Sequence, residues 1–466
     1  MISRRILLAT RLLALAMVLR PGPLLAAPPP PAPDQPADPI AEQIAQAKAY
    51  REAWLKLAPE DVRAHPDAPR FPGAVPAEAP RRANIEVPVP LDPIRWRPKA
   101  RWWQSTGLYA APGEVVTVDV PEDARAVGLY VRIGAHQDNS NPKAKKFKRT
   151  PVNLTRSWPL DRAQVRIASP FGGPVYIEVP PPDARHAARA VAVRVSGAIA
   201  APLFVLGQTT PEQWAAARTA PGPWAELVAP HISITVPSRL VREIDNPTDL
   251  MTFWERGLEL VHELGAGEFT AERLVWDPAI SAGSMHSGHP IMCQGGLDSI
   301  VDLKKLRDGN VWGFFHEMGH NQQYNGWTPK GQTEVTCNWF PMYVRSKGLG
   351  LPPFDRAENW TKPDAPMPRG EGQSPFVALR LWRQIQEEFG WEPFKAVLKE
   401  IHSPEYRTPK TNQAKWDDLL LRFSRATNRD LSPQFTAWGA EVSEQGLQRA
   451  AAAGWPTWAH KDAPGR

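Results

Sequence analysis

The segment FHEMGHN, residues 315–321, constrains the structure of this chain more than any other. Two histidines four residues apart lie on one face of a helix, where the imidazoles of His316 and His320 can reach a single Zn²⁺. Glu317 then lies beside the two ligands and can take a proton from the attacking water. The apolar residues around the motif predict that the rest of this helix is buried, and Gly319 lets a neighbouring segment approach closely.

A third ligand is required because zinc hydrolases use three protein ligands and leave a fourth position open. Glu334 fits, since it starts the segment EVTCNWFPMYV, a predicted second helix after a loop marked by Gly, Pro and Asn. Asn338, one turn further on, is placed to hydrogen-bond the far ring nitrogen of a ligating histidine. The sequence therefore predicts one zinc ion per chain, held by His316, His320 and Glu334. The alternative is a pair of core histidines with ordinary hydrogen-bond partners.

The N-terminal residues predict export. Residues 1–26 have a cationic start, an apolar stretch and small residues at the end, which is typical of a signal peptide cleaved near Ala26. A retained membrane anchor is the alternative, but Arg11 interrupts the apolar stretch, and we expect no stable membrane span after cleavage. The formal charge of +6 includes four arginines and no acid from this segment, so the mature chain carries +2. This charge gives no reason to expect nucleic acid as a partner. The basic run 142–149 is interpreted as a solvated loop, with an acidic-glycan site as the alternative.

Composition divides the rest of the chain into three parts. Residues 27–94 read as a proline-rich linker with one short helix. Residues 95–207 contain short β-rich runs between Pro, Gly, Asp and Asn, which predict a β-sandwich (jelly-roll-like) domain. Helical patterns dominate residues 208–466, the expected catalytic domain, so the fold class is multidomain α+β. The predicted strands cover residues 115–120, 128–134, 163–169, 174–180 and 189–197.

The residues around the metal motif resemble a known family. The pattern WGFFHEMGHNQQ…W…TEVTCNWFPMYV is similar to the M60-like (enhancin-type) zinc metallopeptidases of the gluzincin group, in which a distant glutamate follows HExxH. The stretches GLYAAPGEVVTVDVP, GLYVRIGAH, PWAELVAPHISITVPS and GSMHSGHPIM look like further parts of that family. The resemblance covers about residues 100–460. It implies a jelly-roll-like domain packed against a helical gluzincin domain, with His316, His320 and Glu334 as ligands and Glu317 as the base.

The same resemblance implies a substrate class, heavily O-glycosylated mucin-like proteins whose sugar is part of what is recognised. Asn338 departs from the wider gluzincins, many of which carry Asp there, but an amide still orients a histidine. In gluzincins an edge strand before the zinc helix pairs with the substrate, and residues 281–292 resemble that stretch. His286 or His289 could then donate to the oxyanion, with a polar turn as the alternative. Tyr324 is a rival donor, with simple packing as its alternative.

Other residues near these segments suggest two further features. Trp327, Trp339 and Trp360 lie in or after the loops that form the site, so they are candidates for glycan contacts, although a core role is the alternative. Cys293 and Cys337 are also close in sequence to these segments, and export favours their oxidation to a disulfide.

The leading hypothesis is an exported zinc endopeptidase, periplasmic or secreted, that acts on protein or glycoprotein substrates. Its mechanism is hydrolysis by a water that zinc activates and Glu317 deprotonates. The alternative is a non-catalytic protein that binds glycans or cell surfaces and carries a vestigial or structural zinc site. The presence of Glu317 argues against that alternative, because a structural site has no need of a base. A cell-wall amidase is a third hypothesis, which no cell-wall-binding repeat supports.

Overall fold

The computed structural model describes residues 39–91, 100–181, 189–354 and 375–463. Its contacts separate residues 1–39 from a compact unit of residues 40–466, and the description below concerns this second unit. The predicted signal peptide lies outside the described residues. The short helix predicted near residue 40 is α1 (Pro39–Trp54), and two short helical turns follow it at η1 (Pro59–Asp61) and η2 (Pro69–Gly73).

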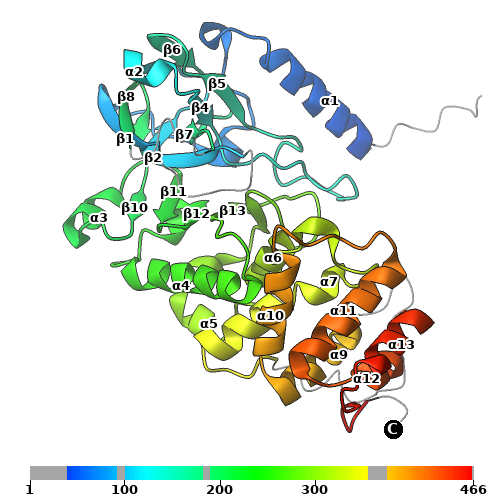
Figure 1. Ribbon diagram of the computed structural model, residues 1–466. Helices are drawn as coiled ribbons and strands as arrows, with labels where there is room; N and C mark the ends of the chain where they lie inside the picture. Colours follow the sequence, from blue (N-terminus) through cyan, green and yellow to red (C-terminus); the bar gives the residue numbers. More distant parts are fainter. Residues whose placement is uncertain (1–38, 92–99, 182–188, 355–374, 464–466) are drawn as a thin grey trace, which may run out of the picture. The chain divides into compact units, whose positions relative to one another are not determined.

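Two antiparallel sheets with a shared hydrophobic core make up the β-rich region (Figure 1). Their strand orders are β1-β8-β3-β6 and β5-β4-β7-β2-β9. In β8, Val191, Val193 and Val195 are buried between more exposed neighbours, an alternation typical of a strand with one face on a core. The five predicted strands coincide with β3, β4, β6, β7 and β8. The elements are β1 (Ile85–Pro90), β2 (Trp102–Ala110), β3 (Val116–Asp119), α2 (Glu122–Arg125), β4 (Tyr130–Ile133), β5 (Arg156–Pro159), β6 (Gln164–Ile167), β7 (Gly173–Val179), β8 (Ala190–Ser196) and β9 (Ile199–Ala200).

A mixed six-stranded sheet follows, in a region where the sequence predicts mainly helices. Its order is β10-β11-β12-β13-β15-β14, so β14 lies at an edge, where it contacts α6. Every residue of β13 is buried, which removes the alternation that would reveal a strand in the sequence. Leu274 belongs to the core that contains the helices and Val275 to the core of the β-rich region, so β13 lies between the two. The elements are β10 (Leu203–Val205), α3 (Pro211–Ala217), β11 (Trp224–Val228), β12 (Ile232–Pro237), η4 (Ser238–Leu240), β13 (Glu272–Asp277), β14 (Met285–His286) and β15 (Ile291–Gln294).

Helices form the remainder of the described chain (Figure 1). Across the described ranges, no helix has the length and hydrophobicity that a membrane span requires. The elements are α4 (Thr248–Gly265), η5 (Asp298–Val301), α5 (Leu303–Arg307), α6 (Trp312–Asn321), η6 (Tyr324–Gly326), α7 (Thr333–Thr336), α8 (Trp339–Tyr343), η7 (Val344–Gly348), α9 (Pro375–Phe389), α10 (Glu392–Ile401), α11 (Asn412–Thr427), α12 (Ser432–Ala437) and α13 (Glu444–Ala452).

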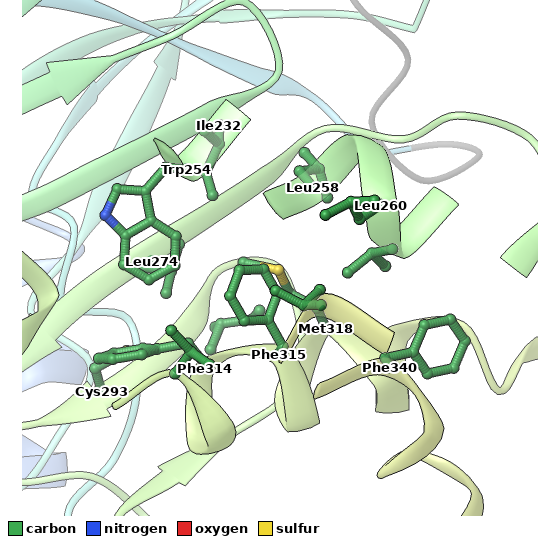
Figure 2. Packing of buried hydrophobic residues seen from close by; sticks show 14 of the residues in the cluster. Ile232, Trp254, Leu258, Leu260, Leu274, Cys293, Phe314, Phe315, Met318 and Phe340 are labelled. Atoms are coloured by element: carbon green, nitrogen blue, oxygen red, sulfur yellow. The ribbon is translucent and has the colours of Figure 1, made fainter. Parts of the chain in front are cut away.

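The apolar face of α6 fixes the orientation of this helix. Figure 2 shows Phe314 and Phe315 packed beside Trp254 of α4, with ring centroids 5.2 and 5.8 Å from the indole. Gly257 leaves room for this packing, because a Cβ atom there would lie 2.4 Å from the Phe315 ring. Fully burying each phenylalanine stabilises the fold by about 1.5–3 kcal/mol. Since this face is held in the core, the face with the two histidines of the motif is turned toward α7.

Candidate metal centre

The structure brings His316, His320 and Glu334 together where α6 meets α7. The Nε2 atoms of the two histidines lie 3.1 Å apart. Glu334 Oε2 lies 3.2 Å from the Nε2 of His316 and 3.3 Å from that of His320. The two imidazole rings are perpendicular, with centroids 4.7 Å apart. Three ligand atoms therefore form a nearly equilateral triangle.

This set of donors fits a zinc ion. Four tetrahedral ligands at about 2.0–2.1 Å from zinc lie about 3.3–3.4 Å from one another, close to the sides of the triangle. Two imidazoles and one carboxylate are a combination found in catalytic zinc sites. Hydrogen bonds to His316 and His320 hold the pKa of Glu334 well below its usual range, so this side chain is an anionic donor.

Gly319 explains how α6 and the following helices come so close. A Cβ atom at this position would lie 2.3 Å from the backbone oxygen of Cys337 and 2.9 Å from the ring of Phe340. Only glycine leaves space for that backbone, because a protein interior is already close-packed. The close approach predicted for Gly319 is confirmed, and it lets α7 carry Glu334 up to the histidines.

Asn338 orients the first histidine. Its Oδ1 atom lies 2.6 Å from Nδ1 of His316 and accepts the proton of that nitrogen, which leaves the Nε2 lone pair facing the triangle. The side-chain amide of Asn338 donates to the backbone oxygen of Glu334 at 2.8 Å. One fully buried amide therefore fixes the tautomer of His316 and the position of the residue that supplies the third donor.

Gln323 does the same for the second histidine, and the sequence analysis missed it. Its Oε1 atom lies 2.9 Å from Nδ1 of His320. Its amide nitrogen donates to the backbone oxygen of Thr333 at 2.8 Å and to Oγ1 of Thr336 at 2.7 Å, so it also ties the end of α6 to α7. Its position three residues after His320 was the available signal, since a residue at that spacing lies next to the histidine on a helix.

Cys337 lies beside the site without completing it. Its sulfur is 3.5 Å from Nδ1 of His316 and 3.8 Å from Nε2. A fourth metal ligand would lie beyond Nε2 and far from Nδ1, so this thiol packs against the edge of the ring instead. Burial raises the pKa of Cys337 well above its ordinary value, which keeps it a neutral thiol. The hypothesis of a disulfide is wrong, because Cys337 and Cys293 are two separate, buried free thiols. Cys337 directly follows α7 and faces α6, whereas Cys293 lies in β15.

Glu317 lies next to the triangle but is not part of it. Its side chain is buried, with 8% of its surface exposed. Burial raises the pKa of Glu317, and the neighbouring charges of His316 and His320 offset this only in part. A carboxylate with a raised pKa, close to a metal site but free of it, has the properties of a general base.

His286 of β14 is held by a residue from the β-rich region. Its Nε2 atom lies 2.7 Å from the carboxylate of Asp138, and its Nδ1 atom lies 3.0 Å from the backbone oxygen of Ser287. The hydrogen bond to Asp138 raises the pKa of His286, and Glu317 is close enough to contribute to this shift. Because both partners are acceptors, both ring nitrogens donate within the protein. In this arrangement His286 has no N–H left for the predicted contact with an oxyanion.

His289 is turned into the protein. Its Nδ1 atom lies 3.4 Å from the carboxylate of Glu272, which is fully buried at the start of β13. Asn321 at the end of α6 donates to the same carboxylate at 2.9 Å and to the backbone oxygen of Gly288 at 3.1 Å. These contacts attach the loop after β14 to the helix that bears the histidine motif. They place His289 in a structural cluster rather than in a position to contact substrate.

Tyr324 is stacked on His402, with ring centroids 4.2 Å apart, but 37% of its surface is exposed, so its role as a donor stays a prediction. Trp327 and Trp339 are buried and lie against each other at 5.6 Å, so of the two roles considered for them the structure shows the core role and not a glycan contact. Their large apolar surface is needed in the core. Trp360 lies outside the described residues.

Two histidines on one helix, a glutamate from the next helix and a buried carboxylate beside them form an arrangement that is typical of metallopeptidases, on a mixed α and β fold. The chain belongs to the peptidase M60, enhancin and enhancin-like family, whose model matches residues 197–439. The model for the N-terminal domain of M60-like peptidases matches residues 77–195. The family assignment made from the sequence is therefore confirmed.

Similar proteins include both animal proteins and bacterial enzymes. TRPM8 channel-associated factor 2 of Homo sapiens is 35% identical over 74% of this chain and 38% of its own length, and that of Mus musculus is 32% identical over 88% and 46%. This chain thus spans less than half the length of these relatives. IMPa from Pseudomonas aeruginosa, solved in complex with an O-glycopeptide, has a TM-score of 0.61 at 18% identity and covers 82% of this chain and 52% of its own. The ZmpB metallopeptidase from Clostridium perfringens has a TM-score of 0.59 at 16% identity and covers 80% of both chains. At these identities, the solved structures establish the shared fold alone.

Proposed function

We propose that this protein is a zinc-dependent endopeptidase. The observation that carries the proposal is the triangle of donor atoms from His316, His320 and Glu334, with the buried carboxylate of Glu317 beside it. Among the described residues, the thiol of Cys337 is the nearest candidate for a fourth protein ligand, and it lies against the His316 ring. Three ligands and an open fourth position are the arrangement of a catalytic site rather than of a structural one.

The residues of the chain then have separate tasks. A zinc ion held by the three donors would polarise the peptide carbonyl and increase the acidity of water. Glu317, whose pKa is raised by burial, accepts the proton of the attacking water and passes it to the leaving amine. Asn338 and Gln323 keep the Nε2 atoms of the two histidines directed at the metal. The edge strand β14 offers its backbone to an extended peptide.

We further propose O-glycosylated, mucin-like proteins as the substrate class, with one zinc ion per chain. Support comes from the fold shared with IMPa, which has been solved with an O-glycopeptide and with T-antigen. We also propose that the two-sheet region is a jelly-roll-like β-sandwich, and that the protein is exported through the signal peptide of residues 1–26. A periplasmic or an extracellular location would follow from export.

A second candidate is a non-catalytic protein that binds glycans or cell surfaces. Similarity to the TRPM8 channel-associated factors favours it, because their names describe association with a channel rather than hydrolysis. Against it stands Glu317, since a structural or vestigial site has no use for a buried base beside the ligands.

The decisive experiment measures zinc content and product formation together. Purified protein is incubated with a panel of defined O-glycopeptides, with and without a chelator, and the products are identified by mass spectrometry. We expect one zinc per chain, cleavage that the chelator abolishes, and loss of zinc in His320→Ala. Full zinc in His320→Ala would remove the proposed ligand set. Zinc binding without cleavage of any glycopeptide or unglycosylated peptide would favour the binding protein.

A further inference from the structure

A pocket with both apolar and polar lining opens in the β-rich region, outside the metal centre. It is lined by α1, by residues 65–70 and by residues 146–151, and it encloses about 550 Å³. This volume lies within the range of small-ligand sites, about 300–1,000 Å³. Gln43, Gln46 and Tyr50 contribute two amides and an aromatic ring from one face of α1. We call it the α1 pocket.

The basic run that borders this pocket is a loop with exposed lysines, as predicted, and buried side chains hold its backbone in place. Arg149 is fully buried and binds both carboxylate oxygens of Asp277, at 2.7 and 2.9 Å. It also donates to the backbone oxygens of Thr150 and Val152, at 2.8 and 2.9 Å. Phe147 is buried as well, with 7% of its surface exposed. These two anchors hold the backbone of the run in a fixed position.

The same anchors keep four lysines at the surface. Lys143, Lys145, Lys146 and Lys148 are all exposed, and none of them forms an ion pair within the described part of the chain. Lys146 lines the α1 pocket. Four like charges in six residues repel one another, so an anion beside them would be favourable.

Other charges in the α1 pocket do not balance these lysines. The carboxylate of Asp67 is bound by Arg70 at 3.1 Å and by Thr150 at 3.2 Å. Arg149 is neutralised by Asp277. Burial lowers the pKa of His65, so this ring adds an aromatic surface rather than a charge near neutral pH. The side chains that line the α1 pocket, together with the lysines beside it, therefore carry a net positive charge.

The α1 pocket is connected to the metal centre through the same loop. Arg149 Nη2 donates to the backbone oxygen of Asp138 at 2.8 Å, and the carboxylate of Asp138 holds His286. His286 in turn lies near enough to Glu317 to influence its pKa. The loop that lines the pocket is thus also the loop that holds His286 of β14.

We propose that the α1 pocket binds an anionic carbohydrate, a sugar chain with a carboxylate or a sulfate ester, carried by the glycoprotein substrate. The aromatic ring and the amides suit a sugar, and the unpaired lysines suit its charge. This inference rests on the proposed function, because it adds a second contact to the substrate of that peptidase. Lys146 is the residue that joins the pocket to the charged run.

The test measures binding separately from cleavage. The full-length chain with Glu317→Gln is titrated calorimetrically with a sialylated O-glycopeptide, the same peptide with unsialylated T-antigen, and a sulfated form. We expect a charged form to bind about 10-fold more tightly than the neutral one, as for hydrogen bonds to charged groups. Comparison of the sialylated and sulfated forms identifies the source of the anion. The preference should weaken at high salt.

A matched pair of variants locates the effect. Lys145→Gln with Lys146→Gln should abolish the preference for the charged glycopeptide. Lys347→Gln with Lys399→Gln removes the same charge from exposed positions outside the pocket and should preserve it. Equal affinity for charged and neutral glycopeptides would overturn the proposal, as would lysine-dependent binding to phosphatidylserine vesicles alone. If the unmutated protein cleaves no peptide but keeps the preference, the peptidase proposal fails, whereas binding of an anionic carbohydrate by the α1 pocket stands without a role in cleavage.

Discussion

The metal centre and the β14 segment beside it are assembled over very different distances along the chain. In the metal centre, His320 is oriented by Gln323, three residues away, and His316 by Asn338, 22 residues away. In the β14 segment, His286 is held by Asp138, 148 residues away in the β-rich region. The comparison teaches that the metal chemistry is encoded locally, whereas the surroundings of a substrate depend on how two distant parts of the fold pack together.

The largest effect should come from Glu317→Gln, which tests the chemistry of the locally encoded region. The amide cannot accept the proton of the attacking water, so we expect the rate of cleavage to fall by at least about 10²–10⁴-fold. Zinc content and glycopeptide affinity should stay unchanged, because Glu317 is not in the donor triangle. Rates from single-turnover assays and metal analysis check this. Cleavage at the parent rate would contradict the proposed mechanism.

Gly319→Ala should break the contact that closes the metal centre. The added methyl group meets the backbone of Cys337, which cannot move aside, so we expect a loss of about 1–3 kcal/mol in stability and a loss of zinc affinity. Gly313→Ala is a matched control on the same helix, because its methyl group would meet only the flexible end of Met285. Thermal unfolding and zinc titration distinguish the two variants, and equal behaviour would show that close approach at Gly319 is not essential.

Asn338→Ala and Gln323→Ala should weaken the metal centre without removing it. Each variant frees one histidine ring to rotate or change tautomer, and we expect about 10–100-fold lower zinc affinity or activity. Competition with a chromogenic chelator measures the affinity. If only Asn338→Ala had an effect, Gln323 would be a residue that ties α6 to α7 rather than one that orients His320.

Asp138→Asn should act on the long-range region alone. The hydrogen bond to Asp138 is the main cause of the raised pKa of His286, so this pKa should fall in the variant, as an NMR titration of the ring would report. Because the pKa of His286 is raised in the folded state, the Asp138–His286 pair stabilises the fold at pH values below the pKa of histidine in the unfolded chain. This stabilisation is lost as the pH rises through the pKa of the folded state.

The effect of Asp138→Asn on activity should be moderate. Cleavage efficiency should fall by about 10-fold, as for loss of a hydrogen bond to a charged group. Zinc affinity should be unchanged in Asp138→Asn. The control Asp161→Asn, at an exposed position, should change neither zinc affinity nor cleavage efficiency. A loss of zinc would show that the two regions are not independent.

The smallest effect should come from Cys337→Ala. The sulfur packs against His316 without occupying a ligand position, so zinc content and activity should remain within about 2-fold, with a loss on the order of 1 kcal/mol in stability. Elemental analysis and denaturant unfolding check this. A large drop in zinc content would instead make Cys337 a fourth ligand and the site a structural one.

Much of the fold could be read from the sequence where periodicity was visible. The strands β3, β4, β6, β7 and β8 were predicted because short β-rich runs lie between turn residues, and β3, β6 and β8 also alternate between buried and more exposed residues. The strand β13 was missed because its sequence, ERLVWD, contains three charged residues that the fold buries, so it shows neither an apolar run nor an alternation. The attachment of the basic run to the rest of the fold could not be predicted, since nothing local shows that Arg149 pairs with Asp277, 128 residues away.

The sequence by itself determined which residues form the metal centre. Helical spacing places His316 and His320 on one face, and Glu334 and Asn338 lie four residues apart at the start of the next helical segment, so short-range geometry is enough. Only the tertiary structure decided the rest. It buried Trp327, Trp339 and Cys337, and it engaged both nitrogens of His286 through Asp138 and a backbone oxygen. Burial and long-range hydrogen bonds depend on which distant segments pack together, and a local pattern carries no record of that choice.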